Sequence, residues 1–473
     1  MIQKLFKLKE NHTDVATEIT AGTTTFMTMA YIIALNPNIL TDFGKNGQDL
    51  WNGIFLGTCI ASAITMFWMA FFANKPYALA PGMGINSFFA ILVLNAVALT
   101  GMSYLASYQT VLTLILAEGL IFLIISGSKA RDKIVGAIPA GIRAAVTPAI
   151  GMFLINIGFG SNASIITDSG SWSVLSDFFG ALNADGARKA MGDSYPAMIL
   201  TVATMFTGLF SIIVLSWKKV RGAVIIGMLI ASAVHWTVQA LFLHSNPFAG
   251  LSIDFLPPFG DMFNTVFFKF NFQGVLKLGL LSSISLVIVL CMVDIFSAIG
   301  SIIGLAALSP DLQKDGKPKN MRETLMCDSI GTITGSAFGM PTVTTFSESA
   351  SGIGSGGRTG LTSLTTGILF LACVFIGPLA KAIPPAATSA ALIYVGILML
   401  MELNKLDFSD VKAFLPSAIM LIAMPISNSI GNSIGLALIS DTIIKMTTGR
   451  AREVSAITYV LSAMFLVNFF VPM

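Results

Sequence analysis

Long apolar segments separated by short polar loops make up most of this chain. A helix needs about 20 apolar residues to cross the hydrocarbon core of a bilayer. About fourteen segments are candidate spans, two of them conspicuously short: 17–40, 51–73, 83–98, 105–127, 133–158, 194–217, 221–243, 276–306, 322–339, 344–356, 360–380, 385–401, 411–428 and 430–447. Only 11% of the residues are charged, against about 25% in a typical soluble domain. The sequence therefore predicts an all-α polytopic membrane protein.

The basic residues predict the orientation of the chain, because cytoplasmic loops carry an excess of lysine and arginine. They gather before the first span and after the fourth, sixth and eighth spans: Lys4, Lys7, Lys9; Lys129, Arg131, Lys133; Lys218, Lys219, Arg221; Lys314, Lys317, Lys319, Arg322. This alternation predicts a multi-pass protein of the cell membrane with a cytoplasmic N-terminus. The hydrophobic segment 454–473 follows the last span, and the sequence leaves open whether it crosses the membrane.

Several functional classes find no support in the composition. The net charge of +3 is too small to indicate a nucleic-acid partner. The four cysteines show no paired spacing, and no Cys/His cluster or HExxH motif is present, so we expect no metal and no cofactor. No nucleophile–base set indicates an intramembrane enzyme. A transporter is the class that remains.

Two segments are conspicuously short, and both are interrupted by proline, glycine and polar residues. The third span begins with PYALAPGMGIN (residues 76–86), and the tenth begins with GMPTVTTFSE (residues 339–348). They hold the same place in two halves of seven spans, and an odd number of spans per half makes the halves inverted repeats. Paired broken segments are a sequence indicator of a transporter's binding site. The alternative is that both are ordinary loops.

Acidic residues inside predicted spans are costly and indicate function by default. Asp294 lies deep in the eighth span and Glu348 at the start of the tenth. Both can accept hydrogen bonds from a ligand and carry a coupling proton; the alternative is that they only tie helices together. Glu118 and Asp328 are weaker candidates, for which packing is as good an explanation as function.

Four stretches resemble a known family: FKLKENHTDVATEITAGTTTFMTMAYIIALNPNIL, PYALAPGMGINSFFA, TTFSESASGIGSGGRTGLTSL and MPISNSIGNSIGLALIS. They are similar to the AzgA-like purine permeases of the nucleobase–cation symporter superfamily, which have the UraA-type fold. The resemblance implies seven plus seven inverted repeats, with short strands in spans 3 and 10 that cross near the substrate. It also implies acids in spans 8 and 10 that contact the base, which are Asp294 and Glu348 here.

The resemblance further implies a core domain and a gate domain. The core would comprise residues 16–128 (spans 1–4) and 275–380 (spans 8–11), and the gate residues 133–244 (spans 5–7) and 384–447 (spans 12–14). The expected function is import of a purine base, guanine, hypoxanthine or adenine, by proton symport with alternating access. The expected partners are a purine, a proton and the lipid bilayer, but no nucleic acid; a homodimer is left open.

The expected substrate site extends beyond the two acids. We place Gly82, Met83, Asn86, Thr344, Phe346 and Ser347 in it as substrate-binding residues, with Asp294 and Glu348 also as proton-coupling residues. One departure bears on specificity: the family's eighth span usually reads close to VDLFDTxGT, and here Ser297 and Ala298 replace the second acid and the threonine. The alternative function is an anion or other small-solute carrier or channel of the same fold.

Overall fold

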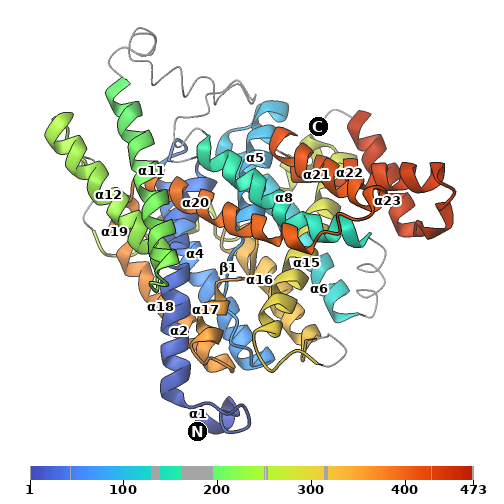
Figure 1. Cartoon of the computed structure of the whole chain (residues 1–473). Helices are drawn as coiled ribbons and strands as arrows, with labels where there is room; N and C mark the ends of the chain where they lie inside the picture. Colours follow the sequence, from blue (N-terminus) through green and yellow to red (C-terminus); the bar gives the residue numbers. More distant parts are fainter. Residues whose placement is uncertain are drawn as a thin grey trace.

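The computed structural model describes residues 2–42, 44–128, 139–160, 195–249, 251, 254–313, 318–427 and 429–470. The first half of the chain forms α1 (Ile2–Leu5), α2 (Val15–Met29), α3 (Ile32–Leu40), α4 (Gln48–Trp68), the π-helix η1 (Met69–Ala73), β1 (Leu79–Pro81), α5 (Met83–Thr100), α6 (Tyr104–Gly127), α8 (Ala140–Phe159), α11 (Tyr195–Trp217), α12 (Ala223–Phe242), α13 (Phe259–Thr265) and α14 (Phe272–Leu278). Figure 1 shows these elements with β1 near the middle of the molecule.

The second half of the chain also contains long helices and one short strand. It forms α15 (Leu280–Ala307), α16 (Met321–Ala337), β2 (Val343–Thr345), α17 (Ser349–Gly354), α18 (Gly360–Ala372), the 3-10 helix η3 (Cys373–Ile376), α19 (Gly377–Ala382), α20 (Pro385–Leu400), η4 (Met401–Lys405), α21 (Val411–Ser427), α22 (Ile430–Thr447), η5 (Ala451–Glu453) and α23 (Ala456–Phe470). The chain is a helical polytopic membrane protein.

Nine helices in the described part of the chain are long and apolar enough to cross a membrane. They coincide with the second to eighth, eleventh and twelfth of the predicted spans, and the helix of the fifth begins at Ala140, directly after its N-cap Pro139. The other predicted spans differ in form. The first is broken at Ala30 and Tyr31, and the tenth is a strand followed by a short helix. The ninth and thirteenth (α16 and α21) are helices of 17 residues each, and the fourteenth (α22) is a helix of 18 residues.

The break in the first span lies close to a proline. Pro37 is inside α3, where it has no N–H to donate to the carbonyl of Ile33. The helical conformation is interrupted at Ala30 and Tyr31, the two residues between α2 and α3. Tyr31 itself is fully buried, so the break directs its side chain into the protein.

The helices pack in two groups. In one group α8 packs on α20 and α21, α11 packs on α12 and α20, and α21 packs on α22. In the other group α4 packs on α3, α16 and α18, and α6 packs on α5, α15 and α16. Gly151 of α8 and Gly396 of α20 allow a very close approach, since a Cβ on either would lie 2.6 Å from the other's carbonyl oxygen. The groups meet where α8 contacts α5 and α15.

Candidate substrate-binding site

The two strands expected in the third and tenth spans are present and pair with each other. β1 and β2 are antiparallel, with Leu79 opposite Thr345, Ala80 opposite Thr344 and Pro81 opposite Val343. Each strand has only three residues, because prolines flank or end them and cannot continue the ladder. All six residues are buried. The two broken segments therefore meet inside the protein, each followed by a helix.

Asp328 of α16 attaches β2 to the helices behind it. Its Oδ1 accepts hydrogen bonds from the backbone N–H of Thr345 (2.5 Å) and the hydroxyl of Thr344 (3.0 Å), and its Oδ2 accepts one from the hydroxyl of Thr345 (3.0 Å). The side chain is fully buried. Three donors satisfy a carboxylate well, so Asp328 positions the strand. Thr344, predicted to contact substrate, has its hydroxyl engaged in this network.

Asp294 belongs to the middle of α15 and contacts Thr342, the residue before β2. Its Oδ2 accepts hydrogen bonds from the hydroxyls of Thr332 (2.7 Å) and Thr342 (3.0 Å). Those two hydroxyls are 2.8 Å apart, and the Asp294 residue is only 1% exposed. Asp294, which the sequence places deep in the eighth span, is therefore buried beside the broken tenth segment.

Glu348 lies at the other end of β2, where it immediately precedes α17. Its Oε1 accepts a 2.8 Å hydrogen bond from the hydroxyl of Tyr31, and its Oε2 accepts one of 3.1 Å from the hydroxyl of Ser347. Glu348 is partly exposed and Ser347 is exposed. This end of β2 is therefore more accessible than Asp294, which is only 1% exposed.

Tyr31 is a site residue that the sequence analysis missed. The available signal was a tyrosine beside a proline-containing stretch, YIIALNP, in a span otherwise rich in threonine and aliphatic residues. A tyrosine hydroxyl in an apolar span needs a partner. The sequence shows the need but not the partner, which lies 317 positions away.

Asn86, in the first turn of α5, contacts the first span. Its amide nitrogen donates to Oδ1 of Asn36 (2.6 Å), and the Asn36 amide donates to Thr58 (2.9 Å). Both asparagines are fully buried. Oδ1 of Asn86 has no hydrogen-bond partner within the described residues, so this oxygen is available as an acceptor.

The remaining predicted residues lie around the strand pair. Gly82 packs on β2, since a Cβ there would lie 3.0 Å from Cγ2 of Thr344. Met83 and Phe346 are buried in the apolar core. The structure thus brings the broken segments, Asp294 and Glu348 together around β1 and β2.

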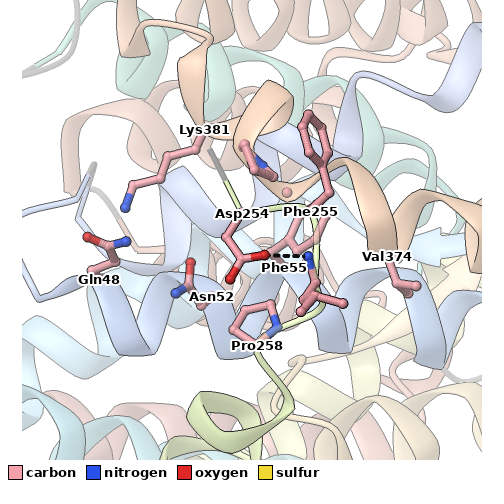
Figure 2. A pocket seen from close by; sticks show the side chains of 11 residues that line it. Gln48, Asn52, Phe55, Asp254, Phe255, Pro258, Val374 and Lys381 are labelled. Carbon is pink, nitrogen blue, oxygen red and sulfur yellow. Dashed lines mark hydrogen bonds between the residues drawn. The ribbon is translucent and has the colours of Figure 1, made fainter. Parts of the chain in front are cut away.

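A separate pocket of about 150 Å³ lies between α4, α19 and the segment before α13. Figure 2 shows Gln48, Asn52, Asp254 and Lys381 around it. Asp254 accepts a 2.9 Å hydrogen bond from the backbone N–H of Leu256, and Lys381 lies 5.9 Å from the Trp51 ring. None of the predicted site residues lines this pocket.

Known proteins resemble this chain over nearly its full length. The putative permease MJ0326 of Methanocaldococcus jannaschii is 34% identical over 99% of this chain and 98% of its own. The guanine/hypoxanthine permease PbuO of Bacillus subtilis is 34% identical over 99% and 100%. The adenine permease AdeP of Escherichia coli is 32% identical over 99% and 96%.

A solved structure shows the same fold at low sequence identity. The transmembrane domain of the cyanobacterial bicarbonate transporter BicA is 16% identical, with a TM-score of 0.59, over 89% of this chain and 97% of that one. The profile of the Permease family matches residues 16–438. With full-length relatives at up to 34% identity, this chain is a membrane transporter that belongs to the Permease family.

Proposed function

We propose that this protein is a secondary active transporter that imports a purine nucleobase by proton symport. The observation that supports it most is the match, over essentially the whole chain, to relatives named guanine/hypoxanthine and adenine permeases. The site adds a physical reason: a purine is planar, neutral and edged with N–H groups. Two carboxyl groups, Asp294 and Glu348, lie at the two ends of β2 and are suited to accept from such an edge.

The base is proposed to enter the site beside Ser347, which is exposed, and Glu348, which is partly exposed. Met83 and Phe346 supply apolar surface close to the strands, and Oδ1 of Asn86 supplies an unused acceptor. Hypoxanthine and guanine present more N–H edge to carboxylates than adenine does, which favours them. Ser297 in place of an acid is the feature that would reverse this preference.

The proposed architecture is fourteen spans in two inverted repeats of seven. The packing groups support a core of residues 16–128 and 275–380 and a gate of residues 133–244 and 384–447, because helices within each group pack mainly on one another. Alternating access would move the gate against the core. We place the protein in the cell membrane with a cytoplasmic N-terminus, and treat α23 as an addition to the repeats. A homodimer would be compatible with this arrangement.

Uptake of radiolabelled bases by cells that express the protein tests the proposal. We expect uptake of hypoxanthine, guanine or adenine that unlabelled purines inhibit and a protonophore abolishes. Inhibition by uracil but by no purine would overturn the substrate assignment. Transport of bicarbonate or another anion without purine uptake would favour an anion carrier, although the two acids at the site argue against that function.

A further inference from the structure

Glu118 lies in the middle of α6, a helix that packs against α15, which carries Asp294, and against α16, which carries its partner Thr332. The Glu118 residue is only 1% exposed. The adjacent Gly119 permits this packing, since a Cβ there would lie 3.2 Å from the backbone nitrogen of Ile333 and from Cγ2 of Thr332. The close approach adds Glu118 to the three carboxyl groups already described around the β-strand pair, those of Asp294, Asp328 and Glu348.

The carboxyl groups of Glu118 and Asp294 are close enough to hydrogen-bond each other. Within the described residues, Oε1 of Glu118 and Oδ1 of Asp294 accept from no protein donor. The threonine hydroxyls occupy the other oxygen of Asp294. Two carboxylates cannot bond to each other, but a carboxylic acid can donate to a carboxylate. A single proton shared between the two carboxyl groups would supply a donor that the described protein groups do not provide to these oxygens.

The surroundings also favour a shared proton. Among the described residues, the buried Cys291 of α15 and Asp328 of α16 interact electrostatically with members of the pair, and neither can supply a positive charge. No ion pair among the described residues includes Glu118 or Asp294. Two like charges this close in a low-dielectric interior repel strongly. Removal of the proton leaves that repulsion uncompensated.

We propose that Glu118 and Asp294 together hold the coupling proton of transport, and that Glu118 is the member of the pair that does not contact the substrate. The proposal rests on the proposed function of purine–proton symport. The proton lies between Glu118 and Asp294 while Oδ2 of Asp294 stays bonded to Thr332 and Thr342. Loss of the proton drives the two carboxylates apart and disturbs Thr342, the residue before β2. Occupancy of the proton site is thereby coupled to the strand that forms the substrate site.

Substitution of Glu118→Gln tests the pair, because glutamine resembles the protonated acid but cannot release a proton. The protein is purified and reconstituted in proteoliposomes that contain a pH-sensitive dye. The purine that the uptake assay has identified as a substrate is added to the outside. We expect counterflow of radiolabelled purine to remain measurable, since exchange needs no net proton movement. Purine-driven proton entry should fall to background, and the initial rate should lose its dependence on external pH. Glu118→Asp should restore proton entry in part.

Glu402→Gln, which removes a partly exposed carboxylate paired with Lys405, serves as the matched control and should behave as the wild type. Proton entry by Glu118→Gln equal to that of the wild type would overturn the proposal. So would the loss of counterflow together with proton entry in a variant that is monodisperse and normally expressed. Wild-type protein without any purine transport would instead contradict the proposed function.

Infrared difference spectroscopy of the wild type gives a second readout that does not depend on whether a glutamine variant folds. We expect the carbonyl stretch of a protonated carboxylic acid at neutral pH, which diminishes as the pH is raised and shifts in Glu118→Asp. The absence of such a band, or a band that the Asp substitution leaves unchanged, would contradict a proton held by this pair.

Discussion

The hydroxyl of Tyr31 donates a 2.8 Å hydrogen bond to Oε1 of Glu348, and so joins the break in the first span to the start of α17. Loss of a hydrogen bond to a charged group costs about 1.5–3 kcal/mol, which corresponds to roughly a 10- to 100-fold change in affinity. We expect Tyr31→Phe to weaken purine binding within that range, measured by scintillation proximity with labelled base. The control Tyr459→Phe removes the hydroxyl of a partly exposed tyrosine, which donates to the carbonyl oxygen of Ala451. Equal affinities for the two variants would contradict a role for Tyr31 at the site.

Neutralisation of either predicted site acid should impair transport. Glu348→Gln replaces an acceptor of the Tyr31 and Ser347 hydroxyls by an amide that also presents N–H groups. Asp294→Asn does the same beside Thr332 and Thr342. We expect uptake to fall at least about tenfold in each, from the loss of a charge-assisted hydrogen bond. Protein level in the membrane is measured first, and normal uptake by either well-expressed variant would refute its assigned role.

The close approach of α16 to β2 should tolerate no side chain at Gly331. A Cβ there would collide with the carbonyl oxygen of Val343 and lie 2.8 Å from Cγ2 of Thr65. We expect Gly331→Ala to lower the free energy of unfolding by about 1–3 kcal/mol and to weaken purine binding, because β2 must move. Gly300→Ala is the control, since nothing lies within 4 Å of its Cβ position. Thermal unfolding in detergent measures both, and equal midpoints would contradict the packing.

Asp328→Asn should weaken the anchor of the same strand. An amide cannot accept from all three donors that Asp328 satisfies, and its NH2 group would face at least one of them. An unsatisfied buried donor costs about 1–3 kcal/mol. We expect a lower thermal midpoint and a reduced purine affinity. A change of pH should restore neither of them. A variant with the wild-type midpoint would show that the carboxylate is dispensable for β2.

Motion between the proposed gate and core can be tested with a disulfide. A Cβ on Gly84 of α5 would lie 3.7 Å from Cβ of Ile150 in α8, within the range of disulfides. With Cys59, Cys291, Cys327 and Cys373 replaced, oxidation of Gly84→Cys/Ile150→Cys should block transport and a reductant should restore it. In the control Ile150→Cys, which carries one cysteine and can form no intramolecular disulfide, the same oxidant should leave transport unchanged. Full transport by the oxidised Gly84/Ile150 pair would exclude this motion.

The sequence alone determined the class of the protein and the places where its spans break. Apolar length and scarce charge require lipid as the solvent, because backbone groups in a bilayer must be satisfied within helices. Proline and glycine act locally, so the broken third and tenth segments were predicted, and both proved to contain a strand. Asp294 and Glu348 were selected as site residues from the cost of a charge in an apolar span, and their roles remain predictions.

Only the tertiary structure decided which polar groups are partners. Asp328 contacts β2, Tyr31 contacts Glu348, and Glu118 contacts Asp294. Each contact joins different elements of the chain, and two of the three carry hydrogen bonds to positions 17 and 317 residues away. The sequence indicates that each buried polar group needs a partner, since leaving it unpaired is costly. It does not contain the distances, because these depend on how closely glycines such as Gly119 and Gly331 allow the helices to approach.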